Sequence, residues 1–146
     1  MLEGIKKLHF VGIGGVGMSA IAEVMLDKGY EISGSDLSES AVVKHLKAKG
    51  ATIYKGHDAL NVEGKEALVL SSAIHQDNPE LVAAKAKGLK LFHRSDILAY
   101  LLNDAKGIAV AGAHGKTTTS SMISVVLEHA KVDPTILIGG FVDYLK

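Results

Sequence analysis

The sequence predicts an α/β fold, a Rossmann-like doubly wound and mostly parallel sheet, from three observations. Short apolar runs alternate with segments of helical periodicity along most of the chain, which is the element order of a parallel α/β sheet. Two glycine-rich loops each follow an apolar run and precede a helical segment, as phosphate-binding loops do in such sheets. The 146 residues are 47% hydrophobic and include no cysteine, so we expect a packed core without disulfides or thiolate metal sites.

Five apolar runs in the first part of the chain predict strands. Each run is short and is bounded by glycine or by polar residues. The run Ala67-Leu68-Val69-Leu70 is apolar throughout, which is typical of a strand buried on both faces of a sheet. In chain order, the expected strands are 8–13, 30–34, 51–54, 67–70 and 89–92.

Four segments between and after these runs predict helices. Apolar side chains recur in them at intervals of three or four residues, and a glycine ends each of the first three. Pro79 stands at the start of the third segment, where a missing N–H is tolerated, and Ser95 is expected to cap the fourth. The expected helices are 18–26, 39–49, 79–87 and a segment from about 95 to 102.

The residues that follow a polar connector at 103–106 predict the start of a second unit. One strand-loop-helix-strand segment cannot easily cover its own sheet, so we interpret it as the opening of a second nucleotide-binding unit that is cut short. Its expected elements are a strand at 108–111, a helix at 117–129 and a strand at 135–138. We therefore expect two domains, residues 1–105 and 106–146.

The first loop matches the pattern G-x-G-x-x-G through Gly12, Gly14 and Gly17. In this pattern the glycines permit the tight turn, the approach of a ligand to the backbone, and the packing of helix on strand. Asp36 lies 19 positions after Gly17, where an acidic residue meets a ribose hydroxyl in dinucleotide folds. The loop predicts a bound nucleoside diphosphate without distinguishing NAD from a UDP-sugar. A turn needed only for close packing is the alternative.

The second loop carries Gly115-Lys116-Thr117, the end of the pattern G-x-x-x-x-G-K-[ST]. The first glycine of that pattern is replaced by Val110, and Gly112 comes two positions later. Lysine in this pattern reaches terminal phosphates and the hydroxyl ligates Mg²⁺, so we expect ATP and magnesium here. A chance Gly-Lys-Thr at a capped helix is the alternative.

Charge and hydropathy exclude several classes of partner. Sixteen basic and sixteen acidic residues cancel, so no overall field favours nucleic acid or an anionic membrane. No apolar run approaches the roughly 18 residues of a membrane span, and the glycines of residues 11–18 fit a phosphate loop better than the core of a signal peptide. We expect a cytoplasmic protein that binds small molecules.

Four segments in this order resemble the Mur ligases of peptidoglycan synthesis. They are HFVGIGGVGMS at 9–19, GSD at 34–36, SSAI at 71–74 and GAHGKTTT at 112–119. The resemblance extends over essentially the whole chain. It implies an N-terminal domain that binds the UDP end of the substrate, a central ATPase domain opened by the second loop, and a C-terminal domain. This chain would supply the first domain and the opening of the second.

The resemblance implies ATP-dependent ligation of L-alanine to UDP-N-acetylmuramate, a step of cell-wall precursor synthesis. ATP phosphorylates the muramoyl carboxylate, the amine of alanine attacks the acyl phosphate, and Mg²⁺ bridges the phosphates. We expect these residues alone to bind the UDP-sugar without making the amide bond. Two alternatives stay open, a recycling ligase that joins a muropeptide to UDP-N-acetylmuramate and a nicotinamide-dinucleotide-binding domain.

The resemblance also implies roles for individual residues, with the first loop on the diphosphate, Asp36 near the nucleoside and His57 near the uracil. Arg94 is a candidate for an anionic group of the substrate. The residues implied for the UDP-sugar are Gly14, Gly15, Val16, Gly17, Met18, Asp36, His57, Ser71, Ser72, Ala73 and Arg94. Those implied for ATP are Gly112, Ala113, His114, Gly115, Lys116, Thr117 and Thr118, of which Lys116 and Thr117 are catalytic and Thr117 ligates Mg²⁺.

Several of these residues have a structural alternative. Ser71 and Ser72 are equally suited to capping a helix, and His57 to an ordinary surface position. Thr118 is suited to satisfying open N–H groups in the first turn of its helix. The family usually has threonine where Ala113 stands, so this loop lacks one hydroxyl.

Overall fold

The computed structural model describes residues 2–138. The chain forms two compact units that meet between Leu101 and Leu102. The division falls a few residues before the boundary expected at 105 and 106. The assignment of a UDP-sugar domain and an ATP-binding domain to these parts stays a prediction.

The first unit is built on a five-stranded sheet in which every pairing is parallel. The strand order is β3-β2-β1-β4-β5, so the chain adds two strands on one side of β1 and then crosses to the other side. This confirms the predicted parallel, doubly wound α/β fold. The strands are β1 (Lys7–Val11), β2 (Glu31–Asp36), β3 (Thr52–Lys55), β4 (Ala67–Leu70) and β5 (Lys90–His93).

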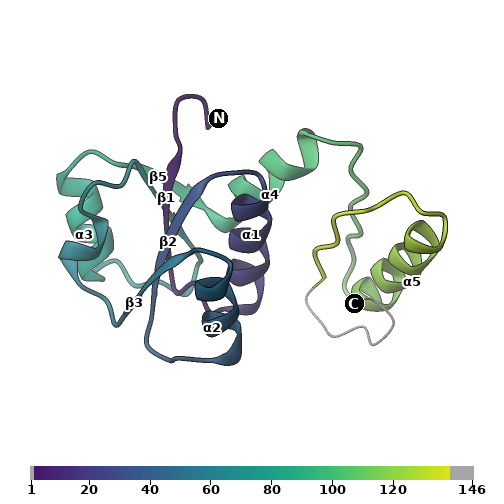
Figure 1. Cartoon of the computed structure of the whole chain (residues 1–146), viewed down its shortest axis with the longest axis horizontal. Helices are drawn as coiled ribbons and strands as arrows, with labels where there is room; N and C mark the ends of the chain where they lie inside the picture. Colours follow the sequence, from purple (N-terminus) through teal and green to yellow (C-terminus); the bar gives the residue numbers. More distant parts are fainter. Residues whose placement is uncertain (1, 139–146) are drawn as a thin grey trace. The chain divides into compact units, whose positions relative to one another are not determined.

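Helices cover both faces of this sheet (Figure 1). Two helices, α1 and α2, lie on one side of the strands, whereas α3 lies on the other side with the short 3₁₀ helix η1 packed against it. Because all the strands are parallel, the loop that follows each of them emerges at the same edge of the sheet. The helices are α1 (Val16–Asp27), α2 (Ala41–Ala48), η1 (Ala59–Val62), α3 (Pro79–Ala86) and α4 (Arg94–Asn103).

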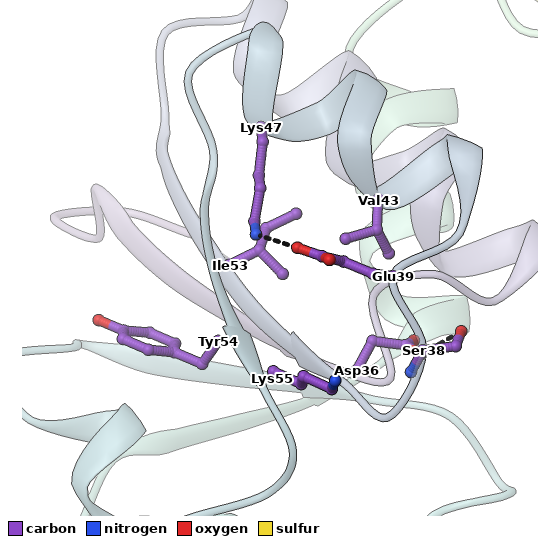
Figure 2. A pocket seen from close by; sticks show the side chains of 8 residues that line it. All are labelled: Asp36, Ser38, Glu39, Val43, Lys47, Ile53, Tyr54 and Lys55. Atoms are coloured by element: carbon purple, nitrogen blue, oxygen red, sulfur yellow. Dashed lines mark hydrogen bonds and ion pairs between the residues drawn. The ribbon is translucent and has the colours of Figure 1, made fainter.

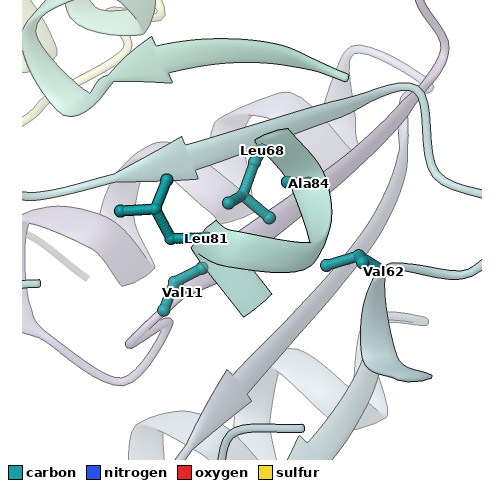
Figure 3. Packing of buried hydrophobic residues seen from close by; sticks show 5 residues of the cluster. All are labelled: Val11, Val62, Leu68, Leu81 and Ala84. Carbon is teal, nitrogen blue, oxygen red and sulfur yellow. The ribbon is translucent and has the colours of Figure 1, made fainter. Parts of the chain in front are cut away.

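The core between the sheet and α3 is a cluster of aliphatic side chains (Figure 3). Val11 and Leu68 come from neighbouring strands, Leu81 and Ala84 from α3, and Val62 from η1. Each is at most 1% exposed. Burial of this kind, at about 25 cal/mol per Å² of apolar surface, holds α3 on the sheet and thereby places its N-terminus.

On the face of the sheet opposite α3, Gly34 in β2 lies very close to Ile13 in the loop after β1. A Cβ atom built there would lie 2.7 Å from the side chain of Ile13 and 2.8 Å from the carbonyl oxygen of Phe10. The loop after β1 therefore folds directly over this strand, and only glycine leaves room for it. Glycine at this position has a packing role that needs no ligand.

One local expectation for the first unit was wrong, and one short helix was not expected. Ser95 does not cap α4, because that helix begins one residue earlier at Arg94, directly after β5. At this junction it is the side chain of Asp96 that bonds to the backbone, since its Oδ2 accepts the N–H of His93, the residue before the helix, at 2.7 Å. The helix η1 was not expected, and it begins after Asp58, whose side chain accepts the N–H of Leu60 at 2.8 Å.

The second unit contains the helix α5 (Lys116–His129), close to the expected range 117–129. The strands expected at 108–111 and 135–138 are absent, because both segments are irregular in this structure. An apolar run becomes a strand only when its N–H and C=O groups meet a neighbouring strand. Within the described residues 102–138, no segment pairs with either run.

Across residues 2–138, no helix has both the length and the apolar character needed to cross a membrane.

Candidate functional site

The first glycine loop turns back sharply on the end of β2. Gly12 has a φ of +72°, a conformation that favours glycine. The N–H groups of Gly12 and Ile13 both donate to the carbonyl oxygen of Ser35, at 2.9 and 3.0 Å. These bonds tie the loop to the carboxyl edge of the sheet, where ligands of doubly wound folds bind.

Two N–H groups of the predicted cradle have no partner among the described residues. They belong to Val16 and Gly17, the first two residues of α1, whose cap Gly15 has no side chain to offer. The other N–H groups of the cradle are already bonded in this structure. Gly14 donates to Oδ2 of Asp36 at 2.8 Å, and Gly15 donates to the carbonyl oxygen of Gly12 at 3.1 Å.

Met18, which was also expected to contact the substrate, lies in the core. Its side chain is 3% exposed, and its N–H donates to the carbonyl oxygen of Gly15 at 2.9 Å. The structure therefore places Met18 beneath the loop. It supports the loop from below, through packing.

Asp36 ties the loop to the segment after β2. Its Oδ2 accepts from Gly14, while Oδ1 accepts from the N–H of Ser38 at 3.0 Å and from the Ser38 hydroxyl at 3.1 Å. A Cβ atom on Gly14 would lie 2.8 Å from that same Oδ2. The carboxylate thus fixes the loop conformation, and glycine at position 14 is required for this contact.

A small open hollow adjoins Asp36 at the carboxyl ends of β2 and β3 (Figure 2). Its charged groups are mixed, and Lys47 pairs with Glu39 at 2.9 Å across it. Asp36 lines this hollow and also accepts from Gly14, so this side chain connects the hollow to the loop of the predicted diphosphate site. Its lining residues are Asp36, Ser38, Glu39, Val43, Lys47, Ile53, Tyr54 and Lys55.

Arg94, the first residue of α4, reaches the start of α1. A Cβ atom built on Gly17 would lie 3.2 Å from both Cδ and Cζ of Arg94, and closer still to one of its guanidinium nitrogens. The structure therefore places a guanidinium directly beside the open N–H groups. A positive charge and a helix N-terminus together favour an anion at this position.

The segment after β4 also lies against the loop. A Cβ atom on Gly12 would come within 3.7 Å of Cδ1 of Ile74, and the N–H of Ile74 donates to the carbonyl oxygen of Ser71 at 3.2 Å. Ser71 is half-buried in this turn, whereas Ser72 and Ala73 are exposed. The cap of α3 is Asn78, so neither serine caps that helix.

Beneath the loop, the carboxylate of Glu80 lies wholly buried among polar side chains from β1, β2, η1 and the loop after β3. Oε1 accepts from Nε2 of His9 at 3.2 Å and from Nδ2 of Asn61 at 2.7 Å. Oε2 accepts from the hydroxyl of Ser35 at 2.6 Å and from Nδ1 of His57 at 2.9 Å. The carboxylate is 0% exposed, and all of its acceptor sites are filled.

These bonds decide the charge of Glu80. Burial raises the pKa of its carboxyl group, but the hydrogen bonds from His9, Ser35, Asn61 and His57 together outweigh burial and hold the pKa at about 2, below the ordinary 4.5. Glu80 is therefore ionised at neutral pH. Across the described residues, no buried side-chain nitrogen or oxygen lacks a partner.

His57 is the outermost member of this cluster. It follows β3, its side chain is 20% exposed, and Nδ1 lies 2.9 Å from Glu80 and 3.0 Å from the Ser35 hydroxyl. It is therefore neither an unattached surface histidine nor a wholly buried one. Its side-chain hydrogen bonds to the described residues are all made through Nδ1.

The second glycine loop is fully exposed within its own unit. Gly115 has a φ of +77° and directly precedes α5, and the N–H of Thr119 donates to its carbonyl oxygen at 3.0 Å. Nζ of Lys116 folds back on the carbonyl oxygens of Gly112 and Ala113. A cation held at the mouth of such a loop suits a phosphate ligand, and His114, Thr117 and Thr118 are solvent-exposed around it.

Sequence reasoning missed the Glu80 cluster. In the sequence, Glu80 follows Pro79 in the first turn of a predicted helix. Carboxylates are common in a first turn because they interact favourably with the helix dipole, so this position alone does not indicate a site. The available indication lies in Ser33 and Ser35, which alternate within and directly after the strand expected at 30–34. Polar side chains on one face of a buried strand require a polar partner.

The carboxylates and histidines of this structure do not form a metal-binding group. Among the described residues, no group of three or more His, Cys, Asp or Glu side chains could hold a metal ion. Thr117 is the one predicted metal ligand, and a single hydroxyl is insufficient for Mg²⁺, which keeps several waters and takes further carboxylate or phosphate oxygens.

Comparison with known proteins identifies the family. Residues 7–106 match the family model described as "Mur ligase family, catalytic domain". The UDP-N-acetylmuramate–L-alanine ligase of Hydrogenobaculum sp. (strain Y04AAS1) is 58% identical over 138 residues, which are 94% of this chain and 31% of the relative. The ligase of the same name from Koribacter versatilis is 51% identical over 143 residues, or 98% of this chain and 31% of the relative. This chain thus spans about a third of the length of these relatives.

Two solved structures resemble this one closely. The UDP-N-acetylmuramate-alanine ligase from Thermotoga maritima is 36% identical, with a TM-score of 0.87 over 96% of this chain and 33% of that one. The UDP-N-acetylmuramate:L-alanyl-γ-D-glutamyl-meso-diaminopimelate ligase from Neisseria is 31% identical, with a TM-score of 0.89 over 98% of this chain and 45% of that one.

Proposed function

This chain belongs to the Mur ligase family, and we propose that it supplies the UDP-sugar site, and the opening of the ATP site, of a ligase that joins L-alanine to UDP-N-acetylmuramate. The names of its relatives support these substrates. The observation that carries the proposal is the pair of open N–H groups at Val16 and Gly17 beside the guanidinium of Arg94.

In the first unit, the diphosphate of the UDP-sugar accepts the N–H groups of Val16 and Gly17 and pairs with Arg94. Charge-assisted bonds of this kind are roughly twice as strong as neutral ones. The nucleoside extends from the loop past Asp36 and His57. The turn at Ser71 closes the other side of the loop through Ile74.

In the second unit, ATP binds the loop from Gly112 to Thr118, with Lys116 on its terminal phosphates and Thr117 as one ligand of Mg²⁺. ATP supplies the phosphoryl group that activates the muramoyl carboxylate for attack by the amine of alanine. Lys116 neutralises the charge that builds up on the transferring group. Because these 146 residues span about a third of the length of the relatives, we expect them alone to bind without turnover.

Calorimetric titration of the 146-residue chain with UDP-N-acetylmuramate, UDP and NADH tests the first site. We expect both uridine compounds to bind and NADH not to bind. A ligand at a hundred times its Kd also stabilises the chain by about 2.7 kcal/mol, so thermal melts give an independent reading. Binding of NADH in preference to both uridine compounds would overturn the proposal.

A matched pair of variants separates the two sites. Arg94→Ala should weaken UDP-N-acetylmuramate binding by about 10-fold or more, because it removes a charge-assisted contact. Lys116→Ala should leave that binding unchanged. In a chimera that joins this chain to the remaining length of the Hydrogenobaculum relative, Lys116→Ala should abolish alanine-dependent phosphate release. Equal loss of UDP-sugar binding in both variants would mean that the sites are misassigned.

A recycling ligase that accepts a muropeptide instead of alanine is the second candidate. It is favoured by the close structural similarity to the Neisseria ligase, whose name gives a tripeptide as the group joined to UDP-N-acetylmuramate. The same chimera cannot decide this, because its acceptor site comes from the relative. The decisive measurement is phosphate release by the native full-length protein with L-alanine and with the tripeptide as competing acceptors.

A further inference from the structure

The Glu80 cluster has a polarity that its packing role does not require. Four side chains donate to one carboxylate, and three of them, His9, Ser35 and Asn61, are fully or nearly fully buried. The fourth, His57, is the one whose ring reaches the surface. The buried negative charge of Glu80 therefore contacts one side chain that reaches the surface, the imidazole ring of His57.

An ionised carboxylate has no proton to donate, so every nitrogen that faces it must carry a hydrogen. Nδ1 of His57 faces Oε2 of Glu80 at 2.9 Å and is therefore the protonated nitrogen. A neutral imidazole with its proton on Nδ1 presents a lone pair on Nε2. Among the described residues, Nε2 of His57 has no partner.

The free nitrogen is placed at the ligand-binding edge of the sheet. Ser35 links His57 to the phosphate loop, because its hydroxyl lies 3.0 Å from Nδ1 while its carbonyl oxygen accepts the N–H groups of Gly12 and Ile13. The N–H of Gly56, the residue before His57, donates to the carbonyl oxygen of Asp36 at 2.8 Å. His57 is thus tied to the phosphate loop through Ser35 and to Asp36, on the predicted nucleoside side of the site, through Gly56.

We propose that Glu80 is a positioning residue that fixes the tautomer of His57, so that Nε2 accepts a hydrogen bond from a donor group of the bound uridine. Glu80 itself touches no ligand. This inference rests on the proposed function, since it assumes that a uridine nucleotide binds at the loop. It adds a basis for selecting uridine by hydrogen bonding, because an acceptor on the protein rewards a ligand donor and disfavours a second acceptor.

The tautomer is measured directly by long-range ¹H–¹⁵N NMR of the unaltered chain, at a pH above the ordinary histidine pKa of about 6.5. We expect the protonated Nδ1 form for His57, and a shift toward protonated Nε2 in Glu80→Gln, whose amide N–H₂ can donate to Nδ1. A predominant Nε2-protonated form in the unaltered chain would overturn the proposal. This measurement needs no ligand.

The ligand contact is tested by two variants of His57 with UDP as the probe. His57→Asn retains an N–H near the Nδ1 position for Glu80 and lacks the outer acceptor, so it should fold and bind UDP about 3- to 10-fold more weakly, the usual effect of one neutral hydrogen bond. His57→Gln offers an acceptor farther out and should recover part of the loss. His57→Asn with unchanged UDP affinity would overturn the proposal.

CDP and 2′-deoxy-UDP identify the donor. A preference for UDP over CDP that disappears in His57→Asn assigns the donor to N3–H of the base, whereas a lost preference over 2′-deoxy-UDP assigns it to the ribose hydroxyl. Preferences that persist unchanged in the variant contradict the inference. If the unaltered chain binds no UDP, the proposed function fails together with the ligand contact, whereas the NMR result still decides the role of Glu80.

Discussion

Replacing Glu80 by Gln should remove a pH dependence of stability that the structure allows us to calculate. The carboxyl group has a pKa of about 2 in the folded chain and 4.5 when exposed. Because the folded pKa is the lower one, the unfolded chain binds more protons between these values. The stabilisation is therefore fully present above pH 4.5 and is lost as the pH falls toward 2.

The size of the effect follows from the two pKa values. Their difference corresponds to about 3 kcal/mol of stability at neutral pH. Titration to pH 3 should remove about 2 kcal/mol of the amount present at pH 5.

Urea unfolding of the unaltered chain and of Glu80→Gln, followed by circular dichroism at pH 5, 4 and 3, checks this. The difference in free energy of unfolding between the two proteins should shrink by about 2 kcal/mol from pH 5 to pH 3. The contributions of the other carboxyl groups are the same in both proteins and cancel in this difference. Glu80→Gln should also be less stable at every pH, since it leaves donors in the cluster without a partner. A gap that does not change with pH would refute the reasoning.

Three further pairs of variants test the packing and the α3 cap. Gly34→Ala should lower the free energy of unfolding by about 1–3 kcal/mol, because the new Cβ meets Ile13 and the Phe10 carbonyl. Gly17→Ala should lower it little, because the new Cβ meets the end of a flexible arginine. Equal thermal shifts for the two variants would contradict this. Asn78→Ala should cost about 1 kcal/mol through loss of the α3 cap, with exposed Val82→Ala as the neutral control in urea titrations. Leu68→Ala should lower the free energy of unfolding by about 2–5 kcal/mol, whereas Leu60→Ala should change it negligibly because Leu60 is 72% exposed. Similar unfolding midpoints for the two variants would argue against the observed core.

The limits of the sequence prediction are clearest where an element depends on a distant partner. Residues 67–70 were predicted as a strand with the observed bounds, because an uninterrupted apolar run of this length indicates a buried strand from local sequence alone. Residues 108–111 have the same local character and form no strand, since pairing is decided by the neighbour and not by the run. The start of α4 was misplaced for a related reason, because Asp96 and His93 bond to each other across the junction.

The sequence by itself determined the alternation of strands and helices, the parallel sheet, the position of both glycine loops and the family. These follow from periodicity, turn residues and short motifs, all of which are local along the chain. Only the tertiary structure decided that Arg94 lies beside Gly17 and that Glu80 joins His9, Ser35, Asn61 and His57. Those contacts join residues up to 77 positions apart, and their distances and buried charge arise only when the sheet brings its loops to one edge.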